Sequence, residues 1–447
     1  MTANAGARLD RLPISSFHRR IMWLIGIGMF FDGFDIYIAA TVLGATLKSG
    51  FSTMSKNAQF VSITFVGMML GSFLTGFLGD RYGRRFTYQA NLAIFGLASI
   101  ASAFAPSMEV LILLRFIMGM GLGAENVVGY STMTEFVPPQ SRGKWLGAMS
   151  VFVVCGLPVS ALVGTLIIPS FGWRAMFVLG GLGALVVWYL RKALPESPRW
   201  LESIGRSQEA DSILQGIERE VSLQHAPLPP PAPVVPAIHS RDLGSLVKPV
   251  LLPRMIVGAT TLIVVNTLIY GFVTWLPTFF VQEGRSIARS FGYSLAMSLG
   301  APIGSAIGAL TADSWGRRPT IIGASLLTIL VGCIYPFIKD PVGLVISGFV
   351  LIIPIYVLVT LLFAIYIPEL FPTEVRLRAS GICNTFGRGA TIITPFMVVA
   401  LFRSYGVGGV LSLMIGLLFV QILVVLIFGV EPKKRRLEEI APEATLP

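Results

Sequence analysis

Long apolar runs recur along the whole of this 447-residue chain, and they restrict its possible folds more than any other feature. Each run has about 20 residues or more, enough for an α-helix to cross about 30 Å of hydrocarbon. A backbone inside lipid must satisfy its own hydrogen bonds, so the runs are either helices or strands of a closed barrel. Barrel strands have about 10 residues of alternating polarity, whereas these runs are longer and apolar on all sides. The sequence therefore predicts an all-α membrane protein.

The number of these runs predicts twelve transmembrane helices. Only 13% of the residues are charged, about half of the roughly 25% found in soluble proteins, so most of the surface faces something other than water. The candidate spans lie at approximately 21–47, 57–78, 86–104, 110–133, 145–168, 174–194, 252–280, 291–311, 320–338, 342–367, 379–402 and 409–430. An even number of spans places both termini on the same side of the membrane.

The basic residues predict which side this is. Of the 34 Lys and Arg residues, 25 fall at the termini, in the even-numbered loops and in the long central loop, and seven fall in the odd-numbered loops. Short loops enriched in Lys and Arg are cytoplasmic, so we expect a multi-pass protein of the plasma (inner) membrane with both termini in the cytoplasm. Topology and lipid headgroups account for the net charge of +11, and we expect no nucleic-acid partner.

One long break divides the spans into two sets of six. Residues 195–250 contain a charged part, of which Ser207 to Val221 has helical spacing, followed by a proline-rich linker. We therefore expect an N-terminal six-helix bundle over 1–194, a cytoplasmic central loop over 195–250, a C-terminal six-helix bundle over 251–430 and a cytoplasmic tail over 431–447.

The two halves repeat each other. GDRYGRR at 79–85 recurs as ADSWGRR at 312–318, and Glu196 after the sixth span matches Glu431 after the twelfth. Glu135, Pro138 and Arg142 likewise recur as Glu369, Pro372 and Arg376. Parallel six-span repeats related by an axis along the membrane normal are an architecture of alternating-access transporters.

These motifs resemble those of the major facilitator superfamily. GDRYGRR and its copy look like the family's cytoplasmic signature loop. RFIMGMGLGAENVVGYSTMTEFVPPQSRG (115–143), PESPRWL (195–201) and PELFPTEVRLRASG (368–381) resemble marks of its sugar-porter-like branch. The resemblance implies two pseudo-symmetric six-helix bundles around a central cavity, which rock to expose one substrate site to each side in turn. We expect the protein to act as a monomer.

Within that branch, DGFD in the first span and TEFVPPQSRG after the fourth resemble the aromatic acid:proton symporters and related metabolite transporters. Sugar porters usually carry a glutamine pair early in span seven, where this chain has Asn266 but no such pair. We therefore expect a symporter that imports protons with a small organic anion, and aromatic carboxylates are among the candidates. The alternatives are a transporter of a neutral solute such as a sugar or polyol, and a non-transporting receptor on the same scaffold.

Four ionisable residues within the first-half spans are candidates for proton coupling: Asp32, Asp35, Arg115 and Glu125. A charge in mid-helix costs about 2.5–3.5 kcal/mol or more if it faces lipid, so these side chains must face the protein interior or a wet cavity. Like-charged neighbours in a low dielectric favour protonation of one of them, and Asp32 and Asp35 share a helix face. The other interpretation is structural: Arg115 forms a permanent pair with either aspartate, and Glu125 is a structural partner.

A second set of residues, in spans one, seven and eleven, is a candidate for substrate binding. Arg388 has no charged counterpart in the first half, and a guanidinium binds a carboxylate through two hydrogen bonds. Its alternative role is an ion pair with a span-one aspartate. The candidates are Arg388, Asn384, Asn266, Tyr270 and Tyr37. Trp275, beside Pro277, fits an anchor at the membrane interface better.

The resemblance also implies inner gates at the duplicated cytoplasmic loops, where acids and bases would bind neighbouring helix ends. The alternative is that their positive charges only set the topology. The gating candidates are Asp80, Arg84, Arg85, Glu135, Arg142, Asp313, Arg317, Arg318, Glu369 and Arg376. We expect no enzyme activity, cofactor or metal, since no nucleophile–base arrangement is visible and His18, His225 and His239 lie outside the predicted spans.

Overall fold

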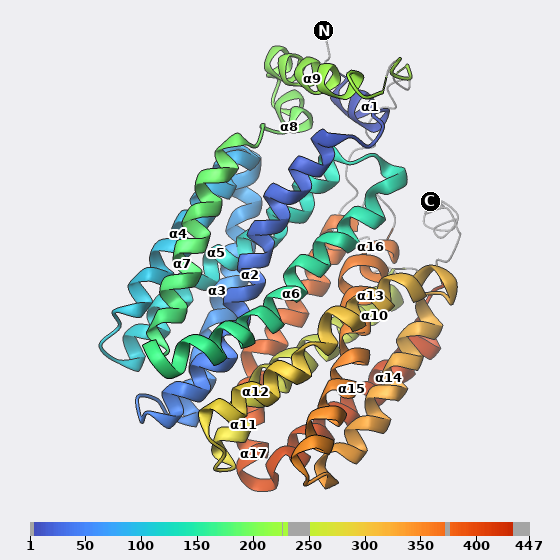
Figure 1. The fold of residues 1–447 in the computed structure, drawn as a ribbon. Coiled ribbons are helices and arrows are strands. Elements are labelled where there is room, and N and C mark those ends of the chain that lie inside the picture. The colour runs from blue at the N-terminus through green and yellow to red at the C-terminus, as the bar shows by residue number, and fades with distance from the viewer. Residues whose placement is uncertain (1–3, 226, 231–250, 372–375, 432–447) are drawn as a thin grey trace. The chain divides into compact units, whose positions relative to one another are not determined.

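The computed structural model describes residues 4–225, 227–230, 251–371 and 376–431, and these are helical almost throughout, with no strand among them. The N-terminal half contains α1 (Ala5–Asp10), α2 (Ser16–Lys48), α3 (Met54–Tyr82), α4 (Arg84–Ala103), α5 (Met108–Phe136), α6 (Pro139–Phe171) and α7 (Arg174–Leu190). The 3₁₀ turn η1 (Arg191–Ala193) and the short helices α8 (Pro198–Ser203) and α9 (Ser207–Ser222) follow. The helix predicted over Ser207 to Val221 is confirmed as α9 (Figure 1).

The C-terminal half has more interrupted helices. It contains α10 (Leu252–Gly271), η3 (Val273–Trp275), α11 (Leu276–Gln282), α12 (Ile287–Ser298), α13 (Gly300–Ser314), α14 (Arg317–Ile334), η4 (Tyr335–Phe337), α15 (Pro341–Thr360), the π-helix η5 (Leu361–Tyr366), α16 (Ile367–Glu369) and α17 (Arg376–Phe428). Span seven is built from α10, η3 and α11, and Pro277 lies at the start of α11. Its ring removes one backbone donor where a new helix begins, so the change of helix there costs little.

Ten helices of the described part are long and apolar enough to cross a membrane. One of these, Ala379–Phe428, holds two of the predicted spans joined across Gly406, which has φ 62° and ψ −157°. The helix α4 has 20 residues and is absent from the ten, because it carries Arg84, Arg85 and several polar side chains. With α4 and with the long helix divided at Gly406, the helices correspond to the twelve predicted spans.

The contacts divide the chain into two compact units. Unit 1 consists of Met1–Asp35, Val66–Gly156 and Phe177–Ala237, and unit 2 of Ile36–Phe65, Leu157–Met176 and Ile238–Pro447. The division therefore falls within α2, α3, α6 and α7. The bundle boundaries predicted at 194 and 251 stay a prediction.

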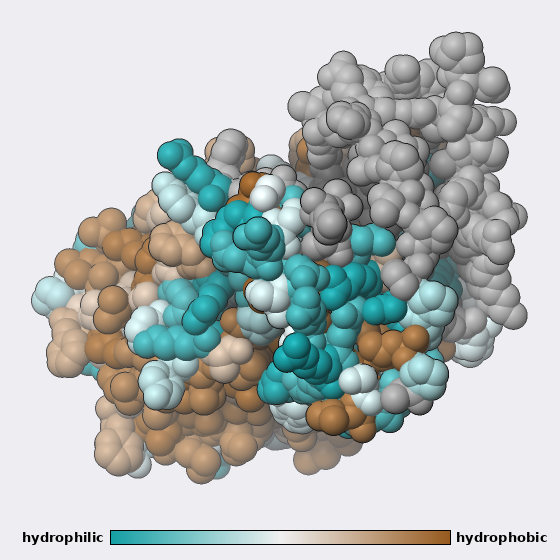
Figure 2. Space-filling model, turned by 90° about the horizontal axis from the view of Figure 1, so that it is seen from above, coloured by the Kyte–Doolittle hydropathy of each residue, from teal (hydrophilic) through white to brown (hydrophobic). Residues whose placement is uncertain are grey.

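The short helices α1, α8 and α9 lie together at one end of unit 1 (Figure 1), and we call them the N-terminal clasp. Residues Ala210, Leu214, Ile217 and Val221 recur on one face of α9 and are buried, as expected for an amphipathic helix. They belong to the same apolar cluster as Leu9 and other side chains of the N-terminal segment. Figure 2 views the molecule from the end that carries α9 and shows hydrophilic side chains gathered on that face.

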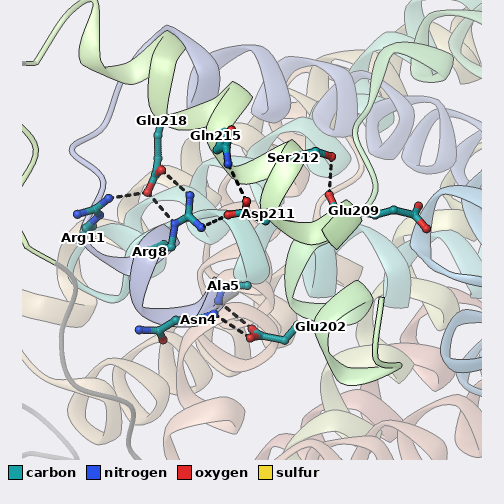
Figure 3. A network of polar contacts seen from close by, with 10 residues as sticks. All are labelled: Asn4, Ala5, Arg8, Arg11, Glu202, Glu209, Asp211, Ser212, Gln215 and Glu218. Carbon is teal, nitrogen blue, oxygen red and sulfur yellow. Dashed lines mark hydrogen bonds and ion pairs between the residues drawn. The ribbon is translucent and has the colours of Figure 1, made fainter. Parts of the chain in front are cut away.

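Ion pairs fasten α1 to α8 and α9 around this apolar cluster (Figure 3). The backbone N–H groups of Asn4 and Ala5 both donate to the Glu202 carboxylate at 2.8 Å. Arg8 binds Asp211 at 2.6 Å and Glu218 at 2.6 Å, and Arg11 binds Glu218 at 2.6 Å. The clasp therefore ties the start of the chain to the segment that follows α7.

The clasp should open when Glu218 loses its charge. Partial burial pushes the pKa of Glu218 up, but its hydrogen bonds and charge interactions with Arg8 and Arg11 outweigh this and hold the pKa below its ordinary value. A carboxylate of lowered pKa stabilises the folded form above its ordinary pKa of about 4.3, and this contribution is lost as the pH falls through the native value. Glu218→Gln should lower the opening free energy of α1 by about 2 kcal/mol, measured by amide hydrogen exchange of α1.

Glu220→Gln is the matched control, because its pair with Arg20 is more exposed, at 29% for Glu220 and 55% for Arg20. Exposed pairs contribute about 0.2–1 kcal/mol. Equal losses of protection in the two variants would contradict a specific role for Glu218.

Candidate functional site: buried charges and a tyrosine cluster

Asp35 and Arg115 form a buried ion pair between α2 and α5 in unit 1. Nη1 of Arg115 contacts Oδ2 of Asp35, and Nη2 donates to the backbone carbonyl of Asp35 at 3.0 Å. The side chains of Asp35 and Arg115 are 0% and 1% exposed, respectively. Sequence left open which aspartate would pair with Arg115, and the structure pairs it with Asp35. Since a guanidinium keeps its charge, the pair balances the charge of each group, although Oδ1 of Asp35 has no hydrogen-bond partner among the described residues.

Asp32, one turn before Asp35 on α2, has a different environment. It is 1% exposed, and neither of its carboxyl oxygens has a hydrogen-bond partner within the part of the chain that the structure describes. The charges that act on it are those of Glu125, Arg191 and Asp35. Two aspartates on one helix face thus have unlike environments, one ion-paired and one without a partner among the described residues.

Glu125 is buried on α5, and its partner is Arg191. Nη1 of Arg191 contacts Oε1 of Glu125, and the side chains of Arg191 and Glu125 are 0% and 1% exposed. Oε2 of Glu125 has no partner among the residues described. Arg191 is one of the basic residues counted from the sequence in the central loop, and the structure buries its side chain against Glu125. Glu125 itself was the signal that sequence reasoning missed, because an acidic residue within a span needs a cationic partner.

Tyrosines and Arg388 gather in unit 2. Tyr356 of α15, which is fully buried, donates a hydrogen bond to the Tyr37 hydroxyl at 3.0 Å. The ring of Tyr270 meets Phe65 edge to face, with centroids 4.4 Å apart. The charge of Arg388 on α17 acts on the Tyr270 hydroxyl. Sequence reasoning missed Tyr356, which lies in an apolar run directly before η5, and π-helical turns occur often at functional sites.

The two candidate asparagines use their amide donors on their own helices. Asn266 Nδ2 donates to the Leu262 carbonyl at 2.7 Å, and Asn384 Nδ2 donates to the Ser380 carbonyl at 2.9 Å. Asn266 is buried and Asn384 is half-buried. Bonds to a carbonyl four residues earlier satisfy the amide inside a helix, so both positions are compatible with a structural role and with substrate binding.

The first of the duplicated loops forms a cap on α4. Gly83 has φ 95° and precedes the helix, and the Glu196 carboxylate accepts the backbone N–H groups of Arg84 at 2.9 Å and Arg85 at 3.2 Å. Arg84 also binds Glu135 at 3.2 Å. A carboxylate at a helix N-terminus satisfies free N–H groups and opposes the helix dipole.

The second loop repeats this arrangement on α14. Gly316 has φ 103°, and the Glu431 carboxylate accepts the backbone N–H groups of Arg317 at 3.1 Å and Arg318 at 2.8 Å. Arg317 binds Glu369 at 2.9 Å. The sequence repeat of Glu196 and Glu431 therefore has a structural basis, since each caps the helix that follows its half's glycine.

Each of these two networks lies within one unit, and the gating role of its residues stays a prediction. Arg85 additionally donates to the Lys192 carbonyl at 2.9 Å, and Arg318 donates to the Leu426 carbonyl. The side chains of the other gating candidates, Asp80, Arg142, Asp313 and Arg376, lie outside the described part of the structure.

Trp275 corrects another expectation. Its sequence context predicts an anchor at the membrane interface, but it is 1% exposed and stacks on Phe279, with centroids 6.2 Å apart. Its position in η3, between α10 and α11, turns the indole into the core of unit 2. An interface anchor would face lipid headgroups.

A cavity of about 260 Å³ in unit 2 contains none of the predicted substrate-binding residues. Its lining includes Phe280, Arg285, Tyr335 and Lys339. The cavity therefore gives no support to Arg388 or the tyrosines, whose case depends on their burial and chemistry.

Long apolar helices with buried charge pairs and duplicated helix caps define a multi-pass membrane transporter built from a repeat. The sequence over residues 25–395 matches the family described as the Major Facilitator Superfamily. The chain belongs to this family, whose members are transporters and not enzymes.

Relatives of known name agree with this membership. The chain is 38% identical over 444 residues, or 98% of each chain, to the inner membrane metabolite transport protein YdjE of Escherichia coli. It is 30% identical over 437 residues to the niacin transporter NiaP of Acinetobacter baylyi, covering 97% of this chain and 99% of that protein. The proton:xylose symporter XylE has the same fold, with a TM-score of 0.70 and 19% identity over 95% of this chain and 98% of that one.

Proposed function

We propose that this metabolite transporter imports a small organic anion, of the aromatic carboxylate class, together with a proton. The observation that carries the proposal is the buried Asp32 carboxyl, whose two oxygens have no hydrogen-bond partner among the described residues. An ionised carboxylate in that position is costly, so the group binds a proton instead. A carboxyl that must gain and lose a proton as its surroundings change is what coupling requires.

Asp35 is suited to a different task in this proposal. Its carboxylate is matched by the permanently charged Arg115, so it stays ionised and fixes α2 against α5. This divides the two roles that the sequence left open: Asp32 carries the proton, and Asp35 with Arg115 holds the helices that position it.

Arg388 and the tyrosines are assigned to the substrate. The guanidinium supplies two parallel donors for a carboxylate, and the aromatic rings of Tyr270 and Tyr37 suit a planar ligand. One relative that matches nearly the whole chain is named a niacin transporter, and niacin is a small aromatic carboxylate. We assign the Glu196 and Glu431 networks to inner gating, with both termini in the cytoplasm.

Uptake by the purified full chain in proteoliposomes tests the function. Labelled nicotinate should accumulate against its gradient when the outside is more acidic than the inside, and dissipating the pH gradient should release it. Labelled D-xylose is the control for a neutral solute. Accumulation of xylose but not nicotinate would overturn the anion proposal, and nicotinate uptake that ignores the pH gradient would overturn coupling.

Arg388→Lys should weaken nicotinate binding by roughly 10-fold or more, because the ammonium keeps the charge but loses the planar fork. Isothermal titration in detergent measures the affinity. Arg403→Lys, at an exposed arginine of the same helix, is the matched control. An unchanged affinity in Arg388→Lys would remove this residue from the substrate site.

A further inference from the structure

The Arg191 side chain is held in an unusual way for a residue at the end of a membrane helix. It turns into unit 1, where its Nε donates to the Leu24 carbonyl at 2.9 Å and its Nη2 to the Ile25 carbonyl at 2.8 Å. Its guanidinium carbon lies 4.7 Å from the centre of the Tyr88 ring. With the Glu125 pair, these contacts satisfy a charge that is 0% exposed.

The sequence of α2 makes room for this guanidinium. A Cβ atom at Gly28 would lie 1.8 Å from Nη2 of Arg191, so any other residue there would displace the side chain. Glycine inside a helix costs about 1 kcal/mol relative to alanine. The close approach of Arg191 to the α2 backbone explains why α2 has glycine at this position.

Asp32 lies one helical turn beyond Gly28 on the same face of α2. Arg191, which approaches α2 at Gly28, is bound to Glu125, and Asp32 lies about 6 Å beyond Gly28 along the helix axis. The charged groups facing Asp32 are Asp35 on α2, Glu125 on α5 and Arg191 after α7, while Tyr88 of α4 faces Arg191 and Glu125. Asp35 is already paired with Arg115, which leaves Arg191, bound to Glu125, as the cation whose charge also acts on Asp32.

We infer that Arg191 is a positioning residue that exchanges between Glu125 and Asp32 and thereby controls when Asp32 holds its proton. This deepens the proposed function and rests on it. While Arg191 binds Glu125, Asp32 stays protonated. When the proton leaves the Asp32 carboxyl, Glu125 accepts it at Oε2, the oxygen without a partner among the described residues, and Arg191 binds the new Asp32 carboxylate. Glu125 releases this proton to water as Asp32 takes up the next one and Arg191 returns to Glu125, so one proton crosses in each cycle and no charge is left unpaired.

The contacts of Arg191 with α2 show toward which end of that helix its guanidinium is anchored. Arg191 binds carbonyls seven and eight residues before Asp32, about 10–12 Å nearer the Ser16 end of the helix. The same segment continues to Glu196, which caps α4 through the Arg84 N–H. A movement of Arg191 is thus transmitted within five residues to the candidate inner gate of unit 1.

Infrared titration of the full chain in lipid tests this switch without any substrate. The protonated-carboxyl band that disappears in Asp32→Asn belongs to Asp32, and its pH midpoint is measured in each variant. In Glu125→Gln, Arg191 is free to bind Asp32 and should lower the midpoint by about one pH unit or more. In Arg191→Gln, loss of the cation should raise the midpoint by a similar amount.

Fixed charges of Glu125 and Arg191 would also give opposite shifts, so the double variant distinguishes an exchange from a static arrangement. If Arg191 moves to Asp32, Arg191→Gln should raise the midpoint by more in the Glu125→Gln background than in the wild type, and equal effects in both backgrounds would overturn the switch. Arg206→Gln, at an arginine 51% exposed on the surface, is the control and should leave it unchanged. Shifts of the same sign, or none, would overturn the inference, and Glu125→Gln alone decides the sign if Arg191→Gln does not fold. Nicotinate counterflow measured on the same samples reports the proposed function separately, so the shifts can hold while that function fails, or the reverse.

Discussion

Asp32→Asn is expected to abolish pH-driven accumulation of nicotinate while leaving exchange of nicotinate across the membrane intact. Asparagine keeps the shape of the protonated acid but cannot release a proton, so the carrier can still alternate but can no longer couple. One pH unit corresponds to about 1.36 kcal/mol per proton, which allows roughly tenfold accumulation. In the variant the ratio should fall to about one, measured in proteoliposomes at a fixed pH gradient.

The same measurement on Asp35→Asn separates the two aspartates. Asp35 binds Arg115, so its replacement leaves a buried cation without its carboxylate and should impair exchange as well as accumulation. Retention of full accumulation in Asp32→Asn would refute the assignment of the proton to Asp32. Loss of both activities in both variants would show that the aspartates act as one unit.

Much of the helical architecture could be predicted because lipid forces a simple pattern. Hydrocarbon permits only long apolar helices or closed barrels, and the spans follow from counting. Where the structure departs from that count, the departures have local causes: α4 is polar enough at its arginines to resemble a soluble helix, and Gly406 joins two spans with a single residue of positive φ.

The candidate site was predicted in part, and the missing part has one physical origin. An aspartate within an apolar run signals a need for a partner, and Arg115 is visible in the same way. The inward position of the Arg191 side chain could not be predicted, because a count of loop charges assumes that an arginine at a helix end faces water. A long side chain can instead turn inward, as the ion pair with Glu125 and the packing against Gly28 show.

The tyrosines illustrate a second limit. Tyr37 was a candidate because it lies in span one, where its ring could line a cavity, but its hydrogen-bond partner Tyr356 is 319 residues away. Apolar runs around a tyrosine give no information on which distant helix its hydroxyl meets. Pairings of this kind depend on tertiary packing, which single-sequence patterns do not encode.

Arg115→Gln is expected to cause a large loss of stability. Removing one partner of a buried ion pair leaves a carboxylate without compensation and costs about 3–5 kcal/mol. The side chains of the pair are 0% and 1% exposed, so solvent cannot replace the lost partner. The melting temperature of the purified protein in detergent, followed by intrinsic fluorescence, should fall clearly below that of the wild type.

The double variant Asp35→Asn with Arg115→Gln distinguishes loss of the pair from loss of packing. Replacing both charges by neutral amides removes the uncompensated charge, so the double variant should be more stable than Arg115→Gln alone. Arg174→Gln, at an exposed arginine, is the control and should melt near the wild type. The deficit of Arg115→Gln should also shrink as the pH is lowered, because protonation of Asp35 removes the stranded charge. If the double variant is as unstable as the single one at every pH, the pair contributes through shape alone. Arg115 would then not keep Asp35 ionised, and the contrast between the charge states of Asp35 and Asp32 would be lost.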